Sequence, residues 1–106
     1  MARHPFEIRY APEVIDQILA LGHRWRGLVR RTIEEQLSHS PLVETKQRKP
    51  LRRPDRWAES WEIRFGPGNR FRVFYRLDVP AHQVRVLAVG EKRGERLFVD
   101  GKEFEL

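Results

Sequence analysis

The sequence predicts an α+β fold, in which an N-terminal strand and an antiparallel helical hairpin pack on one face of a mostly antiparallel sheet of four to five strands. Three patterns predict it: apolar and polar residues alternate over residues 6–10, 61–65 and 70–78, apolar residues recur at helical spacing between 12 and 37, and residues 83–90 are apolar on both faces. A chain of 106 residues has the size of one domain, so we expect residues 1–106 to share a single core.

The first elements are a short strand over residues 6–10 and two helices. Pro12 suits the first turn of a helix, and Gly22 ends the apolar run that follows it. A second apolar stripe from Trp25 to Leu37 predicts a longer helix, which stops before Pro41. Because the turn between the two helices is tight, they are expected to form an antiparallel hairpin.

The second half of the chain predicts a loop and then strands. Residues 41–59 contain three prolines and six basic side chains without clean periodicity, which indicates an exposed loop. Strands are expected over residues 61–65, 70–78 and 83–90, and residues 96–106 predict a small hairpin around an Asp-Gly turn. The segment 83–90 is apolar on both faces and is therefore expected to lie centrally in the sheet.

The period of two assigns the strand side chains to faces. The apolar residues of 61–65 and 71–77 are expected to face the helices, which leaves Arg64 and Arg72 as neighbours on the opposite, water-facing side. Guanidinium groups placed close together repel each other, so this arrangement favours an anionic ligand. Phe74 falls in the same row; it is either a base-stacking platform or a minor core residue beneath the loop.

The charge distribution indicates a polyanion partner. The formal net charge is +6, and residues 46–76 alone contain ten basic and three acidic residues, a net charge of +7. A basic excess concentrated in one segment is typical of nucleic-acid binders, because each neutralised phosphate releases condensed counterions. An acidic protein partner and a merely solubilising surface are the alternatives.

Other classes of function have little support in the sequence. There is no cysteine, so disulfides, thiolate zinc sites and thiol nucleophiles are excluded. The four histidines are widely spaced, which predicts no metal site and no cofactor, and the serines lack the context of a nucleophile elbow. No stretch is long and apolar enough to span a bilayer or to act as a signal peptide, so a cytoplasmic protein without membrane contact is expected.

Five segments together resemble one family of small proteins. They are the strand over residues 6–10 that opens onto Ala-Pro-Glu, the basic Lys49-Pro50-Leu51 segment, the Trp-Glu-Ile-Arg-Phe run at 61–65, the arginine-rich strand at 70–75 and the segment at 86–93. In this order and spacing they resemble the RelE/ParE superfamily of type II toxin–antitoxin toxins, over nearly the whole chain. The element order predicted above is similar to the compact fold of that family.

The resemblance implies a toxin that is neutralised by a cognate antitoxin, expected to be acidic and partly disordered when free. In the RelE branch the toxin is a ribosome-dependent, metal-independent endonuclease that cleaves mRNA and so inhibits translation. The reaction is attack of a ribose 2′-hydroxyl on the adjacent phosphate, which requires a proton acceptor, stabilisation of the crowded phosphorane and a proton donor for the leaving oxygen.

Carried over by position, the resemblance assigns four catalytic residues. Arg64, Arg72 and Arg93 would hold the scissile phosphate, and arginine suits this role because it can contact a phosphate in two places at once. Glu62 stands where RelE enzymes carry a basic residue; it would act either as the base or as an ion-pair partner of Arg64. The catalytic tyrosine near the family's C-terminus has no clear match among residues 97–99.

A second set of residues is expected to bind mRNA and ribosomal RNA. Its members are basic except for the aromatic Phe74: Lys46, Lys49, Arg52, Arg53, Arg76 and Lys92, with Phe74 as the stacking residue. The missing tyrosine leaves two alternatives open. One is a ParE-like toxin that inhibits DNA gyrase without cleaving nucleic acid, and the other is an attenuated, basic RNA-binding module.

Overall fold

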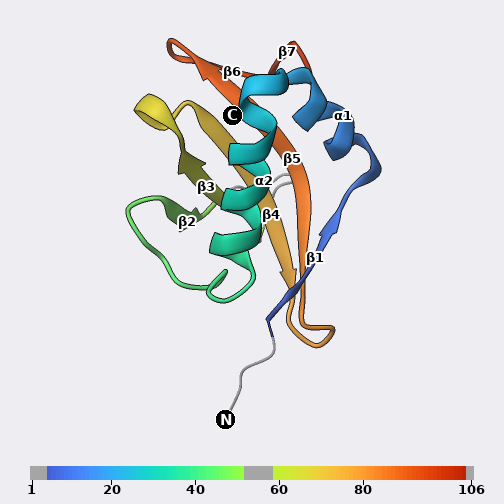
Figure 1. Cartoon of the computed structure of the whole chain (residues 1–106). Helices are drawn as coiled ribbons and strands as arrows, with labels where there is room; N and C mark the ends of the chain where they lie inside the picture. The colour runs from blue at the N-terminus through green and yellow to red at the C-terminus, as the bar shows by residue number, and fades with distance from the viewer. Residues whose placement is uncertain (1–4, 52–58, 105–106) are drawn as a thin grey trace.

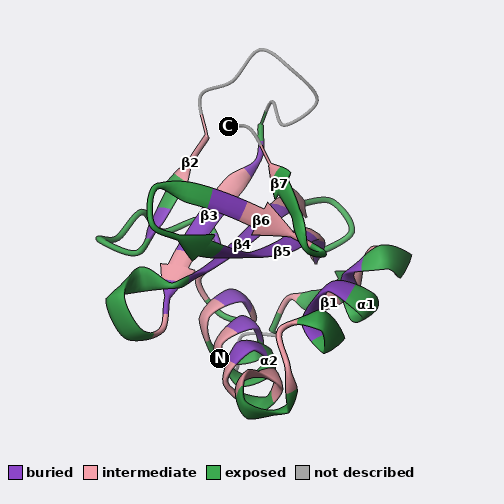
Figure 2. Cartoon of the chain, turned by 90° about the horizontal axis from the view of Figure 1, so that it is seen from above, coloured by how far each residue is buried: buried purple, intermediate pink, exposed green. Residues whose placement is uncertain are grey.

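The chain folds into two layers, with both helices on one face of a single sheet (Figures 1 and 2). The computed structural model describes residues 5–51 and 59–104, and every structural statement refers to these residues. The predicted α+β architecture of an N-terminal strand, a helical pair and a mostly antiparallel sheet is confirmed. The bounds of the elements are β1 Glu7–Tyr10, α1 Pro12–Ala20, α2 His23–Leu37, β2 Arg48–Pro50, β3 Trp61–Phe65, β4 Phe71–Asp78, β5 Gln83–Arg93, β6 Arg96–Val99 and β7 Lys102–Phe104.

The sheet contains seven strands in its described part, where the sequence predicted four to five. Its order is β2-β3-β4-β5-β6-β7, all antiparallel, and β1 pairs in parallel with the first half of β5. β5 is therefore central, as predicted, and continues three residues beyond the expected end at Gly90. The extra residues carry the charged sequence Glu91-Lys92-Arg93 into the sheet.

β2 lies inside the segment that was expected to be a loop. It pairs with β3, and its first residue, Arg48, is buried. The Arg48 guanidinium donates hydrogen bonds to the carbonyl oxygens of Gln36 and Ser40, at 2.7 and 2.6 Å. A side chain that binds the end of α2, rather than an apolar pattern, anchors this strand, which is why periodicity did not reveal it.

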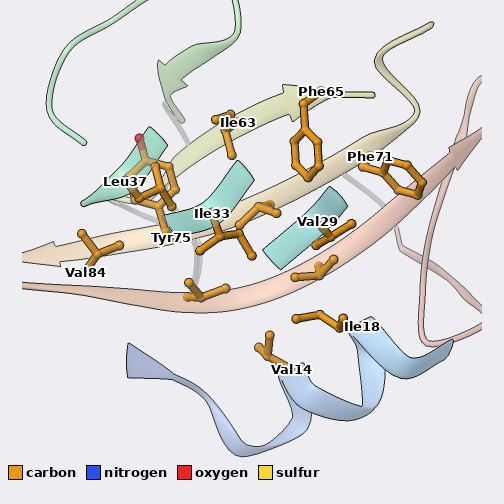
Figure 3. Packing of buried hydrophobic residues seen from close by; sticks show 13 residues of the cluster. Val14, Ile18, Val29, Ile33, Leu37, Ile63, Phe65, Phe71, Tyr75 and Val84 are labelled. Carbon is orange, nitrogen blue, oxygen red and sulfur yellow. The ribbon is translucent and has the colours of Figure 1, made fainter. Parts of the chain in front are cut away.

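The main core lies between the helices and the sheet (Figure 3). Val14 and Ile18 of α1, Ile33 of α2 and Phe71 of β4 are among its members, and they come from the positions that the helical and strand periods assigned to the inner face. The buried Tyr75 reaches across this core, and its hydroxyl donates a hydrogen bond to the Pro41 carbonyl at 2.8 Å. This bond ties β4 to the segment that follows α2.

An irregularity in the middle of β5 changes which side chains face the helices. Phe74 pairs with Ala88 but Tyr75 pairs with Val86, so Leu87 is an extra residue and forms a β-bulge. A bulge shifts the alternation by one position. Val84 and Val86 before it and Val89 after it therefore all face the helices. Ala88 points the other way, whereas strict alternation would place it on the same side as Val84 and Val86.

The face of the sheet away from the helices, called here the far face, carries a second small apolar cluster. Phe74, Ala88 and Leu97 form its buried part, and Leu51, Val99 and Phe104 pack against them. The Phe74 and Phe104 rings stack with their centroids 6.0 Å apart. This cluster covers part of the far face. In the described part of the chain, neither helix is long and apolar enough to cross a membrane.

Candidate anion-binding site

A hollow of about 540 Å³ opens on the far face beside the small apolar cluster, and we call it the far-face pocket. β3, β4, β5 and the β6–β7 hairpin contribute its walls. Its lining consists of Arg64, Arg72, Lys92, Glu95, Arg96, Leu97, Glu103 and Phe104. Four of these eight residues are cationic and two are anionic, so the lining itself suits an anionic ligand.

Arg64 and Arg72 face each other across β3 and β4 as a directly paired couple. Their common counterion is Glu62, which is 2% exposed. The Nε atom of Arg64 donates to Glu62 Oε1 at 2.5 Å, and the Nε atom of Arg72 lies 3.8 Å from the same oxygen. Like charges opposite each other destabilise a sheet, and the carboxylate between them offsets that repulsion.

Arg72 is the more deeply placed of the two arginines. Its side chain is 7% exposed, whereas that of Arg64 is 37% exposed. An Nη atom of Arg72 also donates to the Asn69 carbonyl at 2.9 Å, which fixes the plane of the guanidinium. Burial lowers the pKa of Arg72, and the nearby Arg64 lowers it further against an opposing effect of Glu62. Arginine nevertheless stays protonated at neutral pH, so Arg72 keeps its positive charge in the pocket.

The bulge in β5 decides which basic residue joins this pair. Without it, alternation from Val84 and Val86 would place Arg93 on the far face. With the bulge, Lys92 lines the far-face pocket and Arg93 lies on the helix face, where its Nε atom donates to Glu91 at 3.1 Å. The expected set of Arg64, Arg72 and Arg93 is therefore not brought together, and Lys92 occupies the position beside the first two.

Phe74 is a core residue rather than a platform. It is 1% exposed beneath Phe104, so its ring faces protein on the far face and is not presented to a nucleobase. The sequence left both interpretations open because the small cluster that covers it draws on Leu97 and Phe104 from the distant C-terminal hairpin. Arg76, expected to bind RNA, lines a neighbouring hollow with Ala88 and Phe104 instead of the far-face pocket.

Two of the four residues predicted to dock on the ribosome lie in the described part of the chain. Lys46 and Lys49 are exposed near β2 at the edge of the sheet, and Lys49 lines a shallow hollow with Glu44 and Leu51. Arg52 and Arg53 lie outside the described residues. Lys46 and Lys49 are separate from the far-face pocket, so they belong to a different part of the surface.

Several charged residues of the site were missed from the sequence. Arg96 and Glu103 reach the pocket from β6 and β7 and pair with each other at 3.7 Å. Glu91, which lies on the helix face beside Arg93, carried no signal, because simple alternation from Val84 and Val86 assigns both residues to the far face. Within the described ranges, no three histidine, aspartate or glutamate side chains are grouped so as to hold a metal ion.

Comparison with known proteins rests on structure. No family model and no curated protein matches the sequence. A chain of the RelBE2 toxin–antitoxin complex from Mycobacterium tuberculosis superposes with a TM-score of 0.70 at 26% identity, covering 86% of this chain and 95% of that one. Isolated RelE toxin from E. coli gives 0.63 at 20% identity, with 85% and 88% covered. A double arginine-to-alanine mutant of E. coli RelE in the free state also gives 0.63 at 20%, with 82% and 83% covered. The chain therefore has the fold of the RelE toxins.

Proposed function

We propose that this chain, which has the RelE fold, is the toxin of a type II toxin–antitoxin system and cleaves mRNA on the ribosome. The structural matches to RelE toxins support the assignment of this chain as a toxin. The observation that supports nuclease activity is the far-face pocket, in which Arg64, Arg72 and Lys92 line one hollow. These three cations would surround one phosphodiester and stabilise the charge that develops on a phosphorane.

Glu62 fits the role of a positioning residue better than that of a base. It lies almost completely buried and is bonded to Nε of Arg64, so a ribose hydroxyl would reach it only if that arginine moved. By holding the Nε edge, Glu62 leaves the Nη edge of Arg64 for the phosphate. Two arginines held in fixed planes present their donors without reorganisation, which is what stabilisation of a transition state requires.

The proposed protein partner is a cognate antitoxin, as in the RelBE2 complex of the structural neighbour. An acidic, partly disordered antitoxin would complement the basic far-face pocket and would neutralise the toxin by excluding RNA from it. The mRNA and the ribosomal RNA would be the nucleic-acid partners, and Lys46 and Lys49 would add phosphate contacts outside the pocket.

The test is cleavage of a reporter message in a translation extract, followed by primer extension. Arg64→Gln and Lys92→Met remove exposed cations of the pocket, and each is expected to slow cleavage by about 10²-fold to 10³-fold, as the loss of one oxyanion contact does. Arg85→Gln is the matched control, because Arg85 is 60% exposed and pairs with Asp78, outside the pocket.

Full-rate cleavage by both pocket variants would overturn the assignment of the site. An intact message combined with inhibited gyrase supercoiling would replace the nuclease with a gyrase inhibitor of the ParE type. An intact message, unaffected gyrase and retained RNA binding would leave an attenuated RNA-binding module.

A further inference from the structure

A second arginine pair is built on the helix face of the sheet in the same way as the pair in the far-face pocket. Its central carboxylate is Glu91, which is almost completely buried. Arg70 donates from Nε to Glu91 Oε2 at 2.5 Å, and Arg93 donates from Nε to Oε1 at 3.1 Å. Each carboxylate oxygen thus holds one guanidinium by its Nε edge.

Aromatic rings fix the planes of these guanidiniums. Arg70 lies over the Trp25 ring, 5.2 Å from its centroid, and Arg93 lies over Phe98 at 5.1 Å. Arg24 lies over Trp25 as well, at 4.6 Å. Stacking and the bond to Glu91 together restrict both side chains, so less conformational entropy would be lost when a ligand binds.

The local backbone brings Arg70 to the helix face. Arg70 follows the short 3-10 turn Pro67–Asn69 and has helical torsion angles, φ −61° and ψ −34°, so it precedes the strand alternation that places Arg72 on the far face. The Arg70 carbonyl also accepts a hydrogen bond from the Lys92 amide at 2.7 Å. The two arginine pairs therefore lie back to back at one end of β4 and β5.

The charges of the second cluster are not balanced. Arg70 and Arg93 bind Glu91, and Arg24 joins them by lying over the same Trp25 ring as Arg70. Asp100 lines the small cavity that Glu91 and Arg93 also line, so three arginines and two carboxylates leave a net charge of +1. The Arg70 and Arg93 side chains are 44% and 62% exposed. One arginine is sufficient to pair a buried carboxylate, so the second is available to an external anion, and Nη edges with fixed planes suit a phosphate.

We infer that Arg70 and Arg93, with Arg24, form a second phosphate-contact site that binds the backbone of single-stranded RNA independently of its sequence. The RNA identity of the ligand rests on the proposed function, whereas the phosphate chemistry rests on the cluster itself. A strand that enters the far-face pocket would pass over the end of β4 and be held on both faces of the sheet. Arg93 thus acts as a binding residue and not as a member of the catalytic set.

The test is the salt dependence of binding to a fluorescein-labelled oligouridylate. We compare wild type, Arg70→Gln, Arg93→Gln and the double variant with Arg85→Gln, which removes one exposed, carboxylate-paired arginine outside the cluster. Each phosphate contact that is lost should lower the steepness of log K against log salt by about 0.7. Arg85→Gln should leave the slope unchanged, and a double Arg70→Lys, Arg93→Lys variant should keep it while binding more weakly.

A double variant with the slope of Arg85→Gln, or a wild-type protein that does not bind the oligonucleotide at low salt, would overturn the second site. If the double variant fails to fold, the single variants decide, because each leaves one arginine on Glu91. The two proposals fail separately. If the double variant lowers the slope but the wild type does not cleave message, the second site is supported and the nuclease is not. If the wild type cleaves message but the double variant leaves the slope unchanged, the nuclease is supported and the second site is not.

Discussion

The Nε atom of Arg64 lies 2.5 Å from Oε1 of Glu62, a carboxylate that is buried behind the lining of the far-face pocket. A buried carboxylate therefore compensates part of the positive charge of Arg64 and Arg72. Removing one partner of a buried ion pair leaves the other charges uncompensated, and this costs more than the pair contributes in total. Replacing Glu62 should consequently lower stability without lowering the affinity for RNA.

Glu62→Gln should lower the free energy of unfolding by about 1–3 kcal/mol, because Arg64 and Arg72 then repel each other across β3 and β4. The affinity for oligouridylate should not fall, since the variant gains one unit of positive charge. Message cleavage should slow, because Arg64 loses the carboxylate that holds its Nε edge. Urea unfolding, RNA binding and primer extension measure the three quantities. Equal losses of binding and cleavage, in proportion to the unfolded fraction, would contradict a positioning role.

Glu7→Gln is the matched control for this change. Glu7 pairs with Arg9 two residues along β1 at 2.6 Å, in the same sequence spacing as Glu62 and Arg64, but both partners are more than half exposed. Exposed ion pairs contribute little, so this variant should unfold within about 0.5 kcal/mol of wild type. A cost equal to that of Glu62→Gln would mean that burial of the carboxylate is not the cause.

The layered fold could be predicted because most of its elements carry their own periodicity. Both helices and strands β3 and β4 show apolar residues at the spacing that buries one face, and β5 is apolar on both faces, as its central place in the sheet requires. β2 has only three residues and is fixed by the contacts of Arg48 with the end of α2, twelve residues earlier in the chain. A contact of this kind leaves no local pattern to detect.

The site was harder to predict because one extra residue changes its membership. Arg64 and Arg72 were correctly placed as neighbours, since the turn at residues 66–69 sets their register. Because of the bulge at Leu87, Lys92 and not Arg93 lines the far-face pocket. Nothing in the apolar run around Leu87 marks which residue is extra. Glu91 gave no warning, because it shares its place in the alternation with Arg93 and moves to the helix face together with it.

Arg48→Met should destabilise the chain by about 2–4 kcal/mol. The methionine keeps much of the apolar stem but removes the guanidinium that binds the Gln36 and Ser40 carbonyls, and these groups at the end of α2 then lose their donor. Arg31→Met is the control, because Arg31 makes a long bond, 3.3 Å, to the Gly27 carbonyl on an exposed helix surface. Urea unfolding should separate the two variants clearly; similar values would show that Arg48 does not anchor β2.

Gly90→Ala should be destabilising although glycine is usually a weak residue in a strand. An added Cβ would lie 2.8 Å from the Phe98 carbonyl oxygen and 3.0 Å from Val99 Cγ2, and the backbone of β6 cannot move aside cheaply. We expect a cost of about 1–3 kcal/mol. Gly27→Ala tests the opposite case, since that position is inside α2 with nothing within 4 Å, and it should stabilise by about 0.5–1 kcal/mol. Thermal unfolding of both variants should therefore shift in opposite directions.

Stability at alkaline pH should depend on Tyr75. Burial raises the pKa of the Tyr75 phenol well above its ordinary value, against a smaller lowering by the charge of Arg48. In the unfolded chain the phenol ionises near pH 10, while the folded chain keeps its proton, so rising pH stabilises the unfolded state. The contribution of Tyr75 is thus fully present below about pH 10 and is lost as the pH rises further.

Tyr75→Phe should remove this dependence at a small cost at neutral pH. The loss of the hydrogen bond to the Pro41 carbonyl should lower the free energy of unfolding by about 1 kcal/mol at pH 7. Above about pH 10 the wild type should lose stability more steeply than the variant, which retains only the weaker effect of Tyr10, whose pKa burial also raises. Urea unfolding at several values between about pH 8 and 11 measures the two slopes. Parallel curves would show that the Tyr75 phenol ionises as readily in the folded chain as in the unfolded one.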